Sequence, residues 1–228
     1  DEGSSEAYLG TSKQWSDVEE KMRAIAKSKV GDDFEEAIGD AAFYGPKLDF
    51  MGKDAIGREH QVATIQFDFN QPEGFDLFCV NEESEQERIV MVHCATMGSL
   101  ERFLSVYIEH TAGRFPVWNA PEQIRVLTVN QTDEIVAVAD SIVAKGKELG
   151  LRITLDNDKE SVGKKIRESE LWKVPYVLVI GEKEAASGEV TPRTRSDMQV
   201  GEPQAMKIEN FLQSVANEAK SRVSKSSL

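Results

Sequence analysis

The sequence after Gln123 alternates between short apolar runs and longer amphipathic segments, and this alternation constrains the fold more than any other feature. The apolar runs at 123–129, 151–155 and 174–180 are too continuous for strands that keep one face in water. Apolar residues at helical spacing occupy about 132–149, 161–170 and 204–222. Strands that alternate with helices predict an α/β domain, in which helices cover a mostly parallel, five-stranded sheet.

The first half of the chain has a different pattern, in which short runs rich in Phe, Ile and Val dominate. A helix is expected over 16–29, with Ser16 and Glu19 as a capping box. Five strands separated by Gly, Pro and Asn then predict an antiparallel sheet. An apolar stripe at helical spacing predicts a helix that begins at Ser99 and ends at Gly113. The expected strands span residues 34–38, 42–50, 60–69, 75–80 and 88–95.

The change of pattern near Phe115–Pro116 predicts two domains, an α+β domain at 1–115 and an α/β domain at 116–228. Charge also changes there: the first domain has 11 basic and 23 acidic side chains, the second 16 and 17. An acidic balance argues against non-specific binding of polyanions by the whole surface, but it leaves room for a local basic patch. The alternative interpretation is that the acidic residues only keep the protein in solution.

Composition excludes several other classes of protein. Two cysteines, Cys79 and Cys94, are too few for a disulfide scaffold and fit a reducing compartment. No apolar run reaches the about 18 residues of a membrane span, and no secretory signal pattern is visible. The three histidines are too few to favour a closed four-ligand zinc site within the chain.

Two glycine-containing segments are candidates for binding phosphate. Gly98 precedes a predicted helix that carries Arg102 in its first turn, and a helix start with an arginine suits a polyphosphate. The alternative is a surface arginine on an amphipathic helix. Gly45-Pro46 interrupts an apolar strand just before Lys47, which could face a phosphate or carboxylate. The alternative there is an edge strand with a bulge.

Polar residues on the predicted strands give weaker signals. His93 shares a strand face with apolar neighbours. Two interpretations are therefore open: a packed, hydrogen-bonded histidine or a metal ligand. Gln61 and Gln66 lie five positions apart and fall on opposite faces, unless a bulge lies between them.

Eight basic residues gather in the second domain, but six acidic residues are interleaved with them. The local excess of positive charge is therefore small. A solvated helix explains it as well as a nucleic-acid-binding face does. The basic residues are Lys159, Lys164, Lys165, Arg167, Lys173, Lys183, Arg193 and Arg195.

In combination, these segments closely resemble the C-terminal part of bacterial threonyl-tRNA synthetases, which are class II aminoacyl-tRNA synthetases. The resemblance rests on Tyr44-Gly45-Pro46-Lys47-Leu48-Asp49, on Val92-His93-Cys94-Ala95 and on many spaced segments in the same order. Residues 98–103 resemble the third motif of the class, and 116–228 resemble its α/β anticodon-binding domain. The further matching segments are 57–69, 72–77, 96–103, 108–110, 115–118, 174–176, 181–184 and 193–195.

The resemblance implies a site and a reaction. Arg102 would brace ATP, because charge that develops on a leaving pyrophosphate needs a fixed cation. Lys47 and Gln61 would join it as catalytic residues, and Ser99, Tyr44 and Gln66 would bind ATP and substrate. His93 would be one of three ligands of a zinc ion that holds threonine. A site that binds the hydroxyl of threonine discriminates strongly against valine, which lacks it. Arg167, Glu184 and Arg193 would read the anticodon bases.

The resemblance also implies partners and a place in the cell. Threonine, ATP with magnesium, and threonine tRNA would be the substrates, and a cytoplasmic homodimer without membrane contact would be the assembly. The first two class motifs and the other two zinc ligands would precede Asp1. The sequence is therefore expected to be a piece of a threonine–tRNA ligase that does not catalyse either step alone. Lys159 stands where many members of the family have asparagine, and Glu122 replaces a small apolar residue.

Two other interpretations differ in class or in specificity. A non-catalytic, synthetase-like module could use residues 116–228 to bind tRNA or protein. A histidyl- or prolyl-type relative would share the last domain, but Val92-His93-Cys94-Ala95 and Tyr44-Gly45-Pro46-Lys47 resemble the threonyl type.

Overall fold

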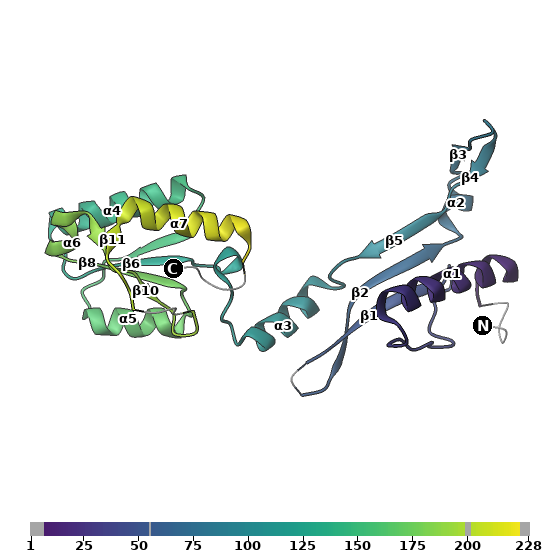
Figure 1. Ribbon diagram of the computed structural model, residues 1–228, viewed down its shortest axis with the longest axis horizontal. Coiled ribbons are helices and arrows are strands. Elements are labelled where there is room, and N and C mark those ends of the chain that lie inside the picture. The colour runs from purple at the N-terminus through teal and green to yellow at the C-terminus, as the bar shows by residue number, and fades with distance from the viewer. Residues whose placement is uncertain (1–6, 55, 199–201, 224–228) are drawn as a thin grey trace. The chain divides into compact units, whose positions relative to one another are not determined.

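The computed structural model describes residues 7–54, 56–198 and 202–223, which form two compact units. Unit 1 is Asp1–His110 and unit 2 is Thr111–Leu228 (Figure 1). The boundary suggested by the sequence at Phe115–Pro116 lies a few residues further on, inside the start of unit 2. No helix among the described residues has the length and apolar character that crossing a membrane requires.

Unit 1 opens with α1, Ser12–Val30, which begins earlier than the sequence pattern predicts. The expected capping box of Ser16 and Glu19 is wrong, because Thr11 and Gln14 form it instead. Thr11 is extended and its Oγ1 accepts a hydrogen bond from the Gln14 backbone N–H, while Gln14 Oε1 accepts from the Thr11 N–H. These bonds satisfy backbone donors that a helix start leaves unpaired.

The sheet of unit 1 has three antiparallel strands in the order β1-β2-β5. They are β1 (Lys47–Lys53), β2 (Glu59–Asp68) and β5 (Met91–Ala95). A separate hairpin, β3 (Phe78–Val80) with β4 (Gln86–Arg88), follows the short helix α2 (Gln71–Gly74). The sequence therefore overestimates this sheet: the expected strands at 42–50, 60–69 and 88–95 contribute to it, whereas those at 34–38 and 75–80 do not.

The expected strand at 34–38 is wrong, since this segment forms no strand. The Arg23 guanidinium of α1 donates two hydrogen bonds to the Glu36 carboxylate, at 2.6 and 2.9 Å, and so holds the segment to the helix. The expected strand at 75–80 begins only at Phe78, because Pro72 at the start of α2 favours a helical turn. The expected strand at 88–95 is split between β4 and β5.

Unit 1 ends in α3, Leu100–Thr111, which follows the sharp turn at Gly98. The predicted apolar stripe is present on this helix, but none of its residues is buried. Leu100, Leu104 and Ile108 are each about half exposed. The described part of unit 1 buries few large apolar side chains, chiefly Trp15 and Met22.

Unit 2 is the α/β domain that the sequence predicts. Its strands β6 (Ile124–Thr128), β7 (Ile153–Asp156) and β8 (Tyr176–Ile180) are parallel, and β10 (Arg193–Thr194) adds an antiparallel edge. The order is β10-β8-β6-β7, so the described sheet has four strands and not the five expected. Buried Pro192, which lacks an N–H donor, lies between β10 and β9 (Glu189–Val190), and β9 pairs with β11 (Met206–Lys207).

Helices cover both faces of this sheet (Figure 1). On one side lie α4 (Asp133–Glu148) and α7 (Ile208–Ser221), and on the other side lies α5 (Val162–Leu171). A short α6 (Glu182–Ser187) follows β8, and a 3-10 turn at Val117–Asn119 precedes β6. The main core lies under α4 and α7, where it includes Ile124, Val126, Ile135, Ile142, Leu178, Phe211, Leu212 and Val215.

Candidate functional site

One extra residue in β2 brings several polar side chains of unit 1 onto the same face of its sheet. In the register of β1 and β2, Phe50 lies opposite Ala63 and Met51 lies opposite Gln61, so Val62 has no partner. A bulged residue shifts the alternation of side chains by one position. Gln61 and Gln66 are five positions apart and would lie on opposite faces of a regular strand. The bulge between them places both on the same face.

The first group on this face joins β1 to β2. Lys47 Nζ lies 2.7 Å from Asp49 Oδ2, and Gln61 Nε2 donates to Asp49 Oδ1 at 2.7 Å. Lys47 also lies 3.2 Å from the exposed Asp40 carboxylate. The hydrogen bond to Asp49 raises the pKa of Lys47, against the opposing effect of partial burial, and Asp40 adds to the rise. Lys47 is therefore a charged ammonium held by two carboxylates.

The second group lies next to the first, since Gln66 is opposite Lys47 on one side and His93 on the other. Tyr44 Oη donates to Gln66 Oε1 at 2.8 Å, and the Tyr44 ring contacts the His93 ring edge-on. His93 Nε2 lies 2.7 Å from Oδ2 of buried Asp68. This face thus brings together five of the predicted residues of unit 1: Tyr44, Lys47, Gln61, Gln66 and His93.

Asp68 fixes the orientation of the His93 ring and selects its tautomer. Burial alone would raise the pKa of Asp68, but hydrogen bonds from His93 and from the backbone N–H groups of Gln71 and Asn70 outweigh it and lower the pKa. An ionised carboxylate only accepts hydrogen bonds, so Nε2 of His93 carries a proton, and in the neutral form of the ring Nδ1 keeps the lone pair. Nδ1 is therefore the nitrogen that this ring offers to a ligand.

One histidine nitrogen does not make a zinc site. Catalytic zinc takes three protein ligands, and the described residues contain no group of three His, Cys, Asp or Glu side chains that could hold a metal. Cys94 is the sequence neighbour of His93 and points to the opposite face of β5. The described residues therefore do not fit a zinc ion by themselves.

The start of α3 lies against the same strand. Gly98 has φ +58°, and a Cβ there would be 3.3 Å from the Gln61 carbonyl oxygen, so the turn needs glycine. Ser99 Oγ accepts a hydrogen bond from the Arg102 backbone N–H at 3.3 Å and donates to Glu101. The Arg102 guanidinium is exposed and has no side-chain partner among the described residues.

Two carboxylates of this face, Asp49 and Asp68, are absent from the sequence prediction. Each follows a predicted residue by two positions on the same strand, since Lys47 precedes Asp49 and Gln66 precedes Asp68. Period-two spacing places such pairs on one side of a strand. That signal could have identified both.

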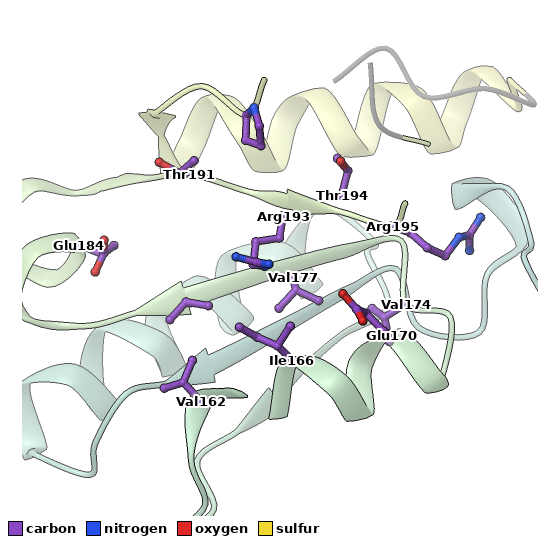
Figure 2. Close-up of a pocket in the computed structure, with 12 residues that line it drawn as sticks. Val162, Ile166, Glu170, Val174, Val177, Glu184, Thr191, Arg193, Thr194 and Arg195 are labelled. Atoms are coloured by element: carbon purple, nitrogen blue, oxygen red, sulfur yellow. The ribbon is translucent and has the colours of Figure 1, made fainter. Parts of the chain in front are cut away.

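Unit 2 contains a groove of about 460 Å³ between α5 and the edge of the sheet (Figure 2). Apolar side chains of α5 and β8 form much of its wall, and two of the predicted anticodon residues, Arg193 and Glu184, line it. Figure 2 shows Glu184 on one side of Arg193 and Glu170 on the other. Its apolar wall residues are Val162, Ile166, Val174, Val177 and Val179.

The charged groups of the groove differ in their freedom to bind. Arg195 is buried, and its guanidinium donates to Asp197 and to the carbonyl oxygens of Lys173 and Phe115. Glu184 Oε2 accepts from the Gly181 N–H at 3.0 Å, which leaves Oε1 for a ligand. Arg193 is exposed, and the described residues give its guanidinium no partner.

The structure separates the other basic residues predicted to form a face. Arg167 is exposed on α5 but does not line the groove. Lys164 pairs with Glu160 at 2.7 Å, and Lys165 is buried. Pairing and burial therefore remove Lys164 and Lys165 from the free positive charge that the sequence suggests.

Two family models together match most of the chain. The tRNA synthetase class II core domain (G, H, P, S and T) matches residues 5–111, and the anticodon binding domain matches residues 123–218. The threonine–tRNA ligase of Phocaeicola vulgatus is 40% identical over 220 residues, which cover 96% of this chain and 33% of that protein. That of Gloeobacter violaceus is 48% identical over 193 residues, covering 84% and 30%.

Solved structures agree with these matches. The crystal structure of the RNA binding domain of threonyl-tRNA synthetase from Cryptosporidium parvum has a TM-score of 0.84 at 36% identity, covering 97% of this chain and 54% of that one. The prolyl-tRNA synthetase of Giardia lamblia has a TM-score of 0.58 at 16% identity, covering 93% and 49%, which shows the fold alone. The chain spans about a third of the length of the curated relatives that it matches.

Proposed function

Because this chain belongs to the threonine–tRNA ligase family of class II synthetases, we propose that it serves such a ligase in two ways. Unit 1 contributes to the site that activates threonine with ATP and transfers it to tRNA. Unit 2 reads the anticodon of threonine tRNA. The observation that carries this proposal is the groove of unit 2, where Arg193 and Glu184 lie beside an apolar wall. RNA binding by this groove can be tested on the 228-residue chain itself.

The roles in unit 1 are those that the resemblance to the family implies, and the chemistry of the side chains suits them. The exposed Arg102 guanidinium at the start of α3 is a permanent charge that suits the phosphates of ATP and the leaving pyrophosphate. Lys47 and Gln61 act at the reacting groups, and Ser99, Tyr44 and Gln66 orient ATP and threonine. The hydrogen bonds that hold these side chains reduce the reorganisation that binding requires.

Other parts of the proposal rest on the family. A bound zinc ion would supply a Lewis acid for the amino and hydroxyl groups of threonine, with His93 as one ligand, and magnesium would accompany ATP. A cytoplasmic homodimer is the expected assembly. The alternative of a non-catalytic module is not favoured, because the relatives are threonine–tRNA ligases and the class II core matches nearly all of unit 1.

Recognition of bases in the groove has a clear physical basis. Single-stranded bases bind proteins through stacking on flat or apolar surfaces and through hydrogen bonds at their edges. The valines and Ile166 give the apolar wall, Arg193 donates, and Glu184 Oε1 accepts. One free guanidinium beside carboxylates gives little net positive charge, so the groove suits a base edge better than a phosphate. Arg167, exposed on α5, would contact the RNA outside the groove.

Binding of anticodon stem-loops to the 228-residue chain tests the proposal. One stem-loop carries a threonine anticodon and two carry unrelated ones, each at two salt concentrations. We expect the threonine stem-loop to bind more tightly and to weaken as salt increases. In Arg193→Gln we expect the affinity for the threonine stem-loop to fall about tenfold, which corresponds to the loss of roughly one charged hydrogen bond. Equal binding of all three by the wild-type chain would contradict the proposal.

A matched control separates base reading from general charge. Lys147 lies in the last turn of α4, on the face of the sheet opposite α5, and it is exposed. Lys147→Gln removes the same charge as Arg193→Gln without touching the groove. We expect it to weaken all three stem-loops slightly and equally. A loss as selective as that of Arg193→Gln would show that the groove is not the reader.

A further inference from the structure

A single carboxylate connects two of the residues proposed to act in catalysis. Asp49 accepts from Gln61 Nε2 with one oxygen, at 2.7 Å, and holds Lys47 Nζ with the other, at 2.7 Å. Lys47 and Asp49 belong to β1, whereas Gln61 belongs to β2. The carboxylate therefore joins two strands at the bulge that places these side chains on one face.

Burial distinguishes Asp49 from the other carboxylate that contacts Lys47. The side chains of Asp49 and Lys47 are each 18% exposed, whereas that of Asp40 is 71% exposed. Asp40 contacts Lys47 but forms no hydrogen bond with Gln61 among the described residues, and an exposed ion pair of this kind contributes little to stability. Charge-assisted hydrogen bonds strengthen as water is excluded, so Asp49 is the dominant partner.

The two bonds to Asp49 also decide which atoms stay free for a ligand. An amide group has an oxygen acceptor and two N–H donors, and the bond to Asp49 uses a donor. The Gln61 side chain is thereby fixed with its Oε1 turned away from Asp49. Lys47 has three N–H donors, and Asp49 and Asp40 occupy two of them. One ammonium donor, one amide N–H donor and the amide acceptor are left.

We propose that Asp49 is a positioning residue of the ligase reaction, which holds the Lys47 ammonium and the Gln61 amide in fixed orientations on the active-site face. It acts through these two side chains and does not touch substrate. The inference rests on the proposed function, because it takes Lys47 and Gln61 as members of the active site. It adds that their placement depends on a third residue that both share.

The direct test measures the two side chains in the 228-residue chain by NMR. In Asp49→Asn, we expect the pH titration of the Lys47 side chain to move to lower pH, because the anionic partner is lost. We also expect the Gln61 side-chain amide protons to exchange faster with water, because a hydrogen bond to the neutral amide oxygen of asparagine is weaker than one to a carboxylate. Both signals are assigned with Lys47→Arg and Gln61→Glu. Two unchanged signals would overturn the proposal.

Two variants serve as controls on the same part of the sheet. Asp40→Asn removes the other carboxylate of Lys47, so we expect it to affect Lys47 and leave Gln61 unchanged. Glu59→Gln removes an exposed ion pair with Lys53, 3.1 Å long, and should affect neither signal. If Asp40→Asn disturbed Gln61 as strongly as Asp49→Asn does, Asp49 would have no special role and the proposal would fail.

Activity gives the functional test, in a threonine–tRNA ligase that contains this segment. Misplacement of reacting groups by about 1 Å can cost roughly a hundredfold in rate. We expect Asp49→Asn to lower kcat of threonine-dependent ATP–pyrophosphate exchange by about tenfold or more, with a smaller change in the KM of ATP. Asp49→Glu keeps the charge and should recover part of kcat, and Glu59→Gln should remain near wild type.

Non-additivity separates positioning from a general loss of stability. If Asp49 acts through Lys47 and Gln61, its replacement adds little once both are alanine. A full additional loss in that background would overturn the proposal. A wild-type ligase without threonine-dependent exchange would instead refute the proposed function. An active wild type with an equally active Asp49→Asn would refute only the positioning role.

Discussion

Replacement of Lys165 by methionine is the most informative perturbation of unit 2. Lys165 is 1% exposed, and its ammonium donates to the carbonyl oxygens of Thr128 at 3.2 Å and Asp156 at 3.1 Å. It also lies 3.5 Å from the Asp156 carboxylate. These acceptors lie at the carboxyl ends of β6 and β7, so one side chain of α5 fastens the helix to both strands. Methionine keeps the apolar stem and removes the three donors.

The size of the effect follows from the groups left without a partner. A buried hydrogen-bonding group that loses its partner costs about 1–3 kcal/mol, and here two carbonyl groups are affected. Breaking a buried ion pair typically costs about 3–5 kcal/mol. The Asp156 side chain is 17% exposed and can regain some water. We therefore expect a loss of about 3–5 kcal/mol in the free energy of unfolding of unit 2.

Hydrogen exchange at the backbone amides of β6 and β7 measures this loss, since it reports the opening of unit 2 separately from that of unit 1. The matched control is Lys164→Met, one residue away, where an exposed pair with Glu160 is lost. That control should cost less than about 1 kcal/mol. If Lys165→Met costs no more than Lys164→Met, the buried ammonium does not fasten α5, and the reasoning is refuted.

Two further predictions concern unit 1. A Cβ at Gly45 would lie 2.1 Å from the Phe67 carbonyl oxygen, so Gly45→Ala should lower the thermal midpoint of unit 1, with a cost of about 1–3 kcal/mol. Gly74→Ala, where a Cβ meets nothing within 4 Å, should not. Because the pKa of Asp68 is lowered in the folded chain, its ionised form stabilises unit 1 above the ordinary aspartate pKa of about 3.9 and this stabilisation is lost as pH falls further. Denaturation of wild type and Asp68→Asn between pH 6 and pH 3 should show a stability difference that shrinks toward the acid end, and a constant difference would contradict the role of the charge.

Periodicity in the sequence is sufficient to predict most of the longer helices and strands of unit 2. The helices α4, α5 and α7 and the parallel strands β6, β7 and β8 appear close to their predicted ranges, because each repeats a local pattern over several residues. Short elements were predicted less well. The segment 34–38 has apolar residues but no strand partner, and α1 begins four residues before its predicted start because Thr11 supplies a better cap than Ser16.

The strand expected over 42–50 is interrupted at Gly45-Pro46, and β1 begins only at Lys47 for a reason that lies in the tertiary structure. The Phe67 and Phe69 N–H groups of the neighbouring strand donate to the Pro46 and Tyr44 carbonyl oxygens. The chain therefore runs beside β2 before β1 begins at Lys47. Glycine is needed because the Phe67 carbonyl approaches too closely for any side chain, which no pattern within this segment reveals.

Local patterns in the sequence are enough to predict the α/β character of the second half and the residue types available for chemistry. Which of those residues act together depends on contacts between segments that are distant in the chain. The unpartnered Val62 places Gln61 and Gln66 on one face, Asp49 joins Lys47 to Gln61, and burial removes Lys165 and Arg195 from the exposed charge. The physical reason is that periodicity is a property of neighbouring residues, whereas register, burial and charge pairing depend on residues that are distant in the chain.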